Sequence, residues 1–401
     1  MSFTIRTVAL VLGVFGLMHA VTYRRDVAFF VGQRHASAPF SSSRSRSAAH
    51  GRAKKPRSAK RGTLAADGQP IGTTFFRRSA LARRIKATSP PLDADSRAMI
   101  EAVSSGGLGR LQFDRAGNGG TAVSTGHRFD QSYTPQCLAH YGPPGNPYGC
   151  AVSATHVRAG ATDGVPTDYH SAFLDASNNG ETDAWLTCAT EKGGNLQGNP
   201  CTFPLPGPLR IGWGASGSRS GDGTGFGGTA ASIALTPGLV RAEDLLAGVD
   251  THGFLVAVQC GAPQSHVYPA QGTDALGAST CTGATAEPRY GQILWLDAAG
   301  ESEMLTMNPG VLRPYIRAWH DFGAYIGDKN EAGTVSAGSD AITVELENSP
   351  AWLRVISSIR SDRHPLDTTV ANGSFHLNPR VPRDFLSHLH VLSTSCSTAG
   401  C

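Results

Sequence analysis

Long apolar runs and aromatic residues are scarce in this 401-residue chain. Few apolar stretches follow Val8–Val21, and aromatic residues make up only 7% of the sequence. The chain is instead rich in turn-forming residues, with 48 Gly and 24 Pro. This composition argues against a helical bundle and favours short strands joined by many turns.

Several signatures of known chemistry are missing. No C-x-x-C pair or His/Cys zinc spacing occurs, and the Gly-rich stretch Gly212–Gly228 lacks the Gly-Lys-Ser/Thr ending of a phosphate-binding loop. Ser216 and Ser218 do not lie in the G-x-S-x-G elbow of α/β-hydrolases. The body does not interleave basic and aromatic residues, so we expect no nucleic-acid partner.

Acidic residues are nearly absent from the first part of the chain. Residues 1–88 hold 17 Lys and Arg against two acids, whereas residues 89–401 hold 18 against 29. We expect residues 1–25 to be a signal peptide or an uncleaved signal anchor, because Arg6 precedes the 14-residue apolar run Val8–Val21. Residues 26–88 should be a basic disordered linker that can contact an anionic surface, and the remainder should form a secreted or surface-exposed domain over 89–395 with a disulfide-bearing tail at 396–401.

The eight cysteines lie beyond residue 136 as close neighbours in the sequence, which favours disulfides formed in an oxidising compartment. Neighbour pairing is the simplest of the possible connectivities. The pairs are then Cys137 with Cys150, Cys188 with Cys201, Cys260 with Cys281, and Cys396 with Cys401. A mitochondrial transit peptide is disfavoured by this pattern.

The body alternates short apolar runs with turns, which predicts a mainly β fold, specifically an antiparallel β-sandwich or jelly roll with one or two short helices. One helix is expected at Asp93–Val103, and a second, with Trp319 in the core, from Pro314 through Ile326, ended by Gly327. The predicted strands are Val152–Val157, Tyr169–Leu174, Thr182–Cys188, Leu209–Trp213, Gly253–Cys260, Gln292–Leu296, Ile342–Leu346 and Leu389–Ser393.

The segment Asp168–Trp185 (DYHSAFLDASNNGETDAW) groups a histidine, several carboxylates and a tryptophan within 18 residues. Asn179-Gly180 predicts a two-residue hairpin turn. A loop with an even number of residues, two or four, places alternate residues of both strands on one sheet face. Those residues are Asp168, His170, Ala172, Leu174, Glu181, Asp183 and Trp185. Carboxylates, an imidazole and an indole on one face are suited to a saccharide site, although the same pattern also fits an ordinary polar sheet face with one core Trp.

Glu181 and Asp183 are the main catalytic candidates, as acid/base or nucleophile, because carboxylates at i and i+2 point the same way and perturb each other's pKa. They resemble the start of the E-x-D-x-x-E signature of the laminarinase- and agarase-type jelly-roll glycoside hydrolases. Leu186 stands where that signature has its third acid, so the resemblance does not supply a complete two-carboxylate mechanism.

Further candidates must come from elsewhere in the chain. Asp168, His170 and His252 are candidate catalytic groups, with His252 as the first partner to test. Trp185, His266 and Tyr268 are candidate substrate-binding residues. Asp168, His170, Asp183 and His252 also have suitable metal-ligand chemistry, but their spacing predicts no metal site, and we expect no cofactor.

An ordered set of motifs runs through the body. These are PLDADSRAM (91–99), DYHSAFLDASNNGETDAW (168–185), GGTAASIALTPGLVRAEDLLAG (227–248) followed by THGFLVAV, HVYPA (266–270), RAWHDFGAYIGDKN (317–330) and VPRDFLSHLHVL near the end. As a set, they resemble a family of exported bacterial β-rich proteins that has no assigned reaction. This resemblance implies one secreted β-rich domain.

Two functional hypotheses follow. The first is a glycoside hydrolase or polysaccharide lyase acting on a polysaccharide or cell-wall polymer. The second is a non-catalytic carbohydrate-binding or cell-surface structural module. Both are expected to act as a monomer. Paired acids across an open groove would favour hydrolysis, and a face without them would favour binding.

Overall fold

The computed structural model describes residues 75–76, 78–104, 111–113, 121–138, 150–163, 169–226, 228–249, 251–258, 260, 262–273, 286–329, 342–366, 368–371 and 374–401. All of them belong to the unit Ser58–Cys401. The leader at 1–25 and most of the basic linker, including its Ser- and Arg-rich part, lie outside the described residues. None of the described helices is long and apolar enough to cross a membrane.

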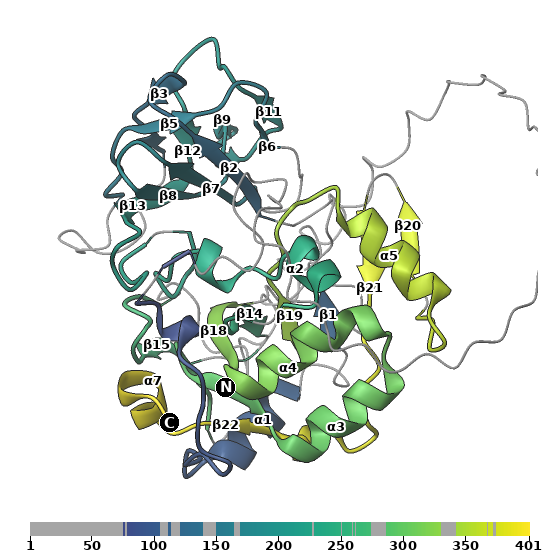
Figure 1. Cartoon of the computed structure of the whole chain (residues 1–401). Helices are drawn as coiled ribbons and strands as arrows, with labels where there is room; N and C mark the ends of the chain where they lie inside the picture. The colour runs from purple at the N-terminus through teal and green to yellow at the C-terminus, as the bar shows by residue number, and fades with distance from the viewer. Residues whose placement is uncertain are drawn as a thin grey trace, which may run out of the picture. The chain divides into compact units, whose positions relative to one another are not determined.

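The structure is mainly β (Figure 1). More of its described residues lie in strands than in helices. Its strands are β1 (Leu111–Phe113), β2 (Ala122–Gly126), β3 (Gln131–Tyr133), β4 (Gln136–Cys137), β5 (Thr155–Val157), β6 (Thr162–Asp163), β7 (Ser171–Asp175), β8 (Gly180–Trp185), β9 (Thr190–Lys192), β10 (Asn195–Gln197), β11 (Cys201–Thr202), β12 (Arg210–Ile211), β13 (Trp213–Ser218), β14 (Phe254–Val258), β15 (Ala262–His266), β16 (Arg289–Tyr290), β17 (Ile293–Leu296), β18 (Ala324–Lys329), β19 (Ile342–Val344), β20 (Thr368–Ala371), β21 (Ser374–Leu377) and β22 (Leu389–Val391). Each of the eight predicted strands overlaps at least one of these.

Helices are more numerous than the one or two that we predicted. The described residues contain α1 (Ser96–Ser104), α2 (Ala242–Ala247), α3 (Ala298–Met307), α4 (Arg313–Asp321), α5 (Trp352–Ser361), α6 (Phe385–His388) and α7 (Thr394–Ala399), with 3-10 turns η1 (Ala80–Ala82), η2 (Thr236–Gly238) and η3 (Gly310–Leu312). The predicted helix at 314–326 is correct only in its first part. It ends at Asp321, Gly323 adopts φ +82°, and the next residues form β18.

The larger sheets are mixed rather than purely antiparallel, and they do not form a clear jelly roll. One has six strands in the order β1-β19-β14-β18-β17-β22, and β14 pairs with β18 in parallel but with β19 in antiparallel. The other has four strands in the order β13-β8-β7-β2, with the β2 and β7 pair parallel. The remaining sheets have two strands each among the described residues.

The main hydrophobic core surrounds the six-stranded sheet. Strand β14 is buried along its whole length, as expected for a central strand covered on both faces. Trp319 on α4 is fully buried and donates its indole N–H to the Leu294 carbonyl oxygen at 3.0 Å, which confirms its predicted core role. Helices α3 and α4 contact each other beside this sheet (Figure 1).

Three predicted disulfides are present: Cys137–Cys150, Cys188–Cys201 and Cys396–Cys401. Cys260 is also disulfide-bonded, while its predicted partner Cys281 lies outside the described residues. Such bonds indicate an oxidising, extracellular environment.

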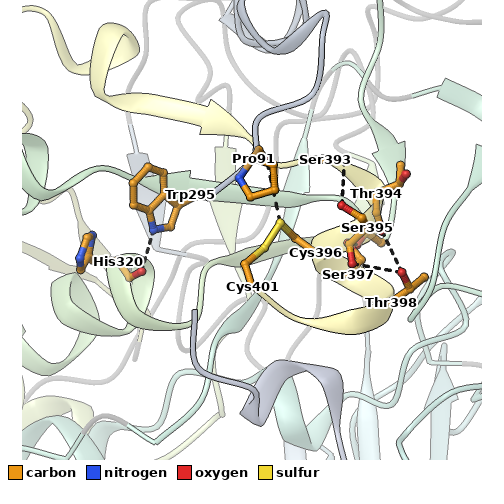
Figure 2. Close-up of a disulfide and its surroundings, with 11 residues drawn as sticks. Pro91, Trp295, His320, Ser393, Thr394, Ser395, Cys396, Ser397, Thr398 and Cys401 are labelled. Atoms are coloured by element: carbon orange, nitrogen blue, oxygen red, sulfur yellow. Dashed lines mark hydrogen bonds between the residues drawn. A yellow bond between two sulfur atoms is a disulfide. The ribbon is translucent and has the colours of Figure 1, made fainter. Parts of the chain in front are cut away.

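The ends of the described chain pack together. Figure 2 shows the Cys396–Cys401 bond beside Pro91, whose carbonyl oxygen lies 3.8 Å from Cys396 Sγ. The Cys401 carbonyl accepts hydrogen bonds from the backbone N–H groups of Lys86 and Ala87 at 3.0 and 2.9 Å. Buried Phe76 and Leu81 show that packing begins before the boundary expected near residue 89.

Candidate functional site

Strands β7 and β8 form the predicted hairpin (Figure 1). Asp175 pairs with Gly180, so the loop contains the four residues 176–179 rather than a two-residue turn. The Asn178 side chain accepts a hydrogen bond from Gly180 N at 2.7 Å, and Asn179 adopts φ +54°. Because four is even, the predicted face is correct for the described residues, and Ala172 lies opposite Asp183.

Glu181 and Asp183 lie side by side on that face but are enclosed, with exposed fractions of 1% and 0%. Their carboxyl groups are hydrogen-bonded to each other. Asp183 Oδ2 accepts Leu235 N at 2.8 Å, and Glu181 Oε2 accepts the hydroxyl of Thr236 at 2.5 Å. The pair therefore attaches the start of η2 to the four-stranded sheet.

Burial raises the pKa of both carboxyl groups. Burial, and then the neighbouring Glu181 charge, raises the pKa of Asp183 well above its ordinary value. Burial also raises the pKa of Glu181, although hydrogen bonds from Asp183 and Thr236 partly oppose the shift. Two carboxyl groups in contact away from water cannot both ionise readily, which favours the protonated form of Asp183.

The other predicted residues of this face do not create an open groove. His170 is buried, with 7% of its surface exposed. Trp185 is half-buried and lies opposite Trp213, also half-buried, so both indoles belong to the face of Glu181 and Asp183. Asp168 lies outside the described residues.

His252 belongs to a different cavity. Its Nδ1 donates to the Gly253 carbonyl oxygen at 2.6 Å, and it lines a small cavity of about 30 Å³ together with Arg241 and Asp244. Burial lowers the pKa of His252, which favours the neutral imidazole. The contacts described for His252 do not include Glu181 or Asp183, so the predicted partnership is not formed.

His266 and Tyr268 lie in a third environment, different from those of the carboxyl pair and of His252. His266 is exposed at the end of β15. Tyr268 donates its hydroxyl to Asp222 Oδ2 at 3.2 Å and accepts a hydrogen bond from Arg83 at 3.3 Å. Burial, and then the Asp222 charge, raises the pKa of Tyr268, so this phenol is a poor base. The sequence-predicted residues are thus distributed over separate environments.

A cleft of about 330 Å³ opens on the opposite face of the same hairpin. It is bounded by the hairpin, β13 and the segment before β5, and its walls are mainly hydroxyl-bearing. The lining residues are Ser153, Ala154, Thr155, Asp175, Asn178, Gly180, Glu181, Thr182, Ser216, Gly217 and Ser218. A hydroxyl pair, Thr182 Oγ1 with Ser216 Oγ at 2.7 Å, fixes the wall.

Beside the cleft, Asp175 holds His156, a residue that the sequence reasoning did not single out. Asp175 is 2% exposed, and its Oδ2 lies 2.8 Å from His156 Nδ1. Burial alone raises the pKa of Asp175, but hydrogen bonds from Ser177 and His156 outweigh it and hold that pKa below its ordinary value. Asp175 is therefore an ionised partner for the imidazole. The D-x-S pattern Asp175–Ser177 next to the turn was the available local signal, but nothing local pointed to His156.

Within the described residues, no group of three or more His, Cys, Asp or Glu side chains is placed to hold a metal ion. The chain also has no match among protein-family models, curated proteins or solved structures.

Proposed function

We propose that this is a secreted or surface carbohydrate-active protein that binds a polysaccharide or cell-wall polymer in the cleft between β8, β13 and the segment preceding β5. The observation that carries the proposal is the lining of this cleft of about 330 Å³, which includes five Ser and Thr residues and the Asn178 amide. Such groups can exchange hydrogen bonds with sugar hydroxyls in both directions.

The geometry favours binding over glycoside hydrolysis. A hydrolase needs two carboxyl groups that face the scissile bond from opposite sides. Glu181 and Asp183 instead contact each other. They also accept hydrogen bonds from Leu235 N and the Thr236 hydroxyl. In this proposal, the predicted catalytic pair Glu181 and Asp183 is therefore a structural bridge.

An exposed aromatic ring lies near the same end of the sheet. Phe129 is 85% exposed in the turn that follows β2. Gly126, at the end of β2, pairs with Asp175, and its carbonyl accepts Ala176 N at 2.9 Å, so the two turns are neighbours. An exposed ring in a turn next to the hairpin turn suits a pyranose face, the role predicted for Trp185 on the opposite side.

The binding test uses Ser153→Leu. Ser153 is exposed at the cleft, and its backbone N–H, which the substitution keeps, donates to Ser216 Oγ at 2.8 Å. We expect the added side chain to lower affinity for a binding polysaccharide at least about tenfold, or about 1.4 kcal/mol. The measurement is affinity electrophoresis and calorimetry over a panel of neutral and acidic polysaccharides.

The matched control is Ser357→Leu, the same change at an exposed position of α5. It should bind like the wild type. Loss of binding in Trp185→Ala with full binding in Ser153→Leu would place the ligand on the opposite face and overturn the cleft assignment. No binding by the wild-type chain to any member of the panel would contradict the proposed function itself.

A further inference from the structure

We propose that His156, oriented by Asp175, is a general base that hydrolyses an ester group carried by a saccharide in the cleft. This inference rests on the proposed function for its ligand, and it adds an activity to a site otherwise used for binding. The dyad joins two strands: His156 comes from β5 and Asp175 from the end of β7.

The hydrogen bonds fix the tautomer of His156. Asp175 accepts four of them: from Ser177 N and Oγ at 2.9 and 2.5 Å, and from His156 N and Nδ1 at 3.1 and 2.8 Å. An ionised carboxylate can only accept, so in the neutral imidazole Nδ1 carries the proton and Nε2 carries the lone pair. No hydrogen-bond partner of Nε2 occurs in the described part of the chain, and the side chain is 26% exposed.

Ser177 is not placed as a nucleophile for this imidazole. Its hydroxyl contacts Asp175 and lies 3.3 Å from Nδ1, the nitrogen that the carboxylate already uses. In a serine triad, the hydroxyl faces the other ring nitrogen. The arrangement therefore leaves Nε2 to act on water rather than on a protein hydroxyl.

The backbone around His156 is packed closely. A Cβ added at Gly126 would lie 1.9 Å from the His156 carbonyl oxygen, so this glycine lets β2 approach β5. On its other side, His156 pairs with Ser132 of β3. Its carboxylate partner Asp175 lines the cleft. The ring is thus held by fixed strands against a lining residue of the cleft, which is the preorganisation that acid–base catalysis needs.

The presence of one base, rather than two opposed carboxyl groups, favours ester hydrolysis over glycosidic cleavage. Glycosidic cleavage needs a second carboxyl group across the substrate, and Asp175 is fully engaged in its four hydrogen bonds. Ester hydrolysis needs one base. Nε2 takes a proton from water while the water oxygen bonds to the acyl carbon, and the ester C–O bond then breaks. The sugar oxygen leaves with the proton from Nε2, so the products are a carboxylic acid and a free hydroxyl group.

The test is His156→Asn in the full chain. The Asn amide N–H can replace the Nδ1 donor to Asp175, but the variant has no equivalent of Nε2. We expect release of acetate from acetylated xylan, and of 4-nitrophenol from 4-nitrophenyl acetate, to slow at least about 100-fold, the usual minimum for a general base. The melting temperature should change by less than about 3 °C.

The matched control is His127→Asn, the same change at an exposed histidine in the neighbouring turn. It should hydrolyse both esters at the wild-type rate. Equal ester hydrolysis by the wild type and His156→Asn, or none by the wild type, would overturn this inference. Retained polysaccharide binding in that case leaves the proposed function standing, whereas loss of binding in the wild type overturns both.

Discussion

Replacing Asp183 with Ala is expected to lower the free energy of unfolding by about 3 kcal/mol or more. Asp183 is 0% exposed, so its removal leaves the Leu235 N–H and one side of Glu181 without partners where water does not reach. Asp183→Asn keeps the shape, an acceptor for Leu235 N and a donor for Glu181, and it should cost less than about 1 kcal/mol at neutral pH. Urea unfolding followed by tryptophan fluorescence measures both changes.

The pair Glu181 and Asp183 should also make the stability of the fold depend on pH in a defined direction. The folded pKa of Asp183 lies above its ordinary value of 3.8, so the folded state binds this proton more tightly than the unfolded state does. The stability from Asp183 is complete below about pH 4 and is lost as pH rises through the folded pKa. The wild type should therefore lose stability relative to Asp183→Asn as pH rises from about 4 toward the folded pKa of Asp183. An unchanged difference over that range would show that Asp183 is ionised in the fold.

Replacing Arg241 with Met is expected to cost about 3–5 kcal/mol, because it leaves a buried carboxylate without its cation. Arg241 Nε lies 3.1 Å from Glu347 Oε2, and the two side chains are only 1% and 2% exposed. The guanidinium also contacts Asp244 at 3.5 Å and lies 5.0 Å from the centre of the Phe75 ring. These contacts connect α2 to the segment after β19 and to the start of the described chain.

The double variant Arg241→Met with Glu347→Leu separates the missing charge from lost packing. Two apolar side chains can fill the space without a buried charge, so the double variant should recover at least half of the loss. Thermal and urea unfolding of the single and double variants provide the comparison. If the double variant is less stable than Arg241→Met, the packing around the guanidinium, and not the uncompensated Glu347, accounts for the effect.

Several features of the fold could be predicted because they depend on local rules. Strand alternation has a period of two, so the shared face of Ala172, Glu181 and Asp183 needed only an even loop, and four residues satisfied that condition. Neighbouring cysteines close short loops, and three such pairs were correct. Trp319 was assigned to the core from its helical spacing.

The segment Ala324–Lys329 shows where local rules fail. Ile326 fits the spacing of the preceding helix, yet it pairs in a strand with Val256 of β14. A short apolar run satisfies either structure, and the choice depends on a partner about 70 residues away. The mixed direction of the sheets has the same origin, because strand order is decided by long-range pairing.

The sequence by itself determined that this chain is rich in short strands, pairs neighbouring cysteines and carries its acids on one face of a hairpin. Only the tertiary structure decided what those acids do. Leu235 and Thr236, more than 50 residues further along, cover Glu181 and Asp183 and make them a buried bridge. His156 and Asp175 come from different strands and meet beside the cleft. Alternation along a strand defines a face, but burial depends on what packs against that face, and that contact is made by distant parts of the chain.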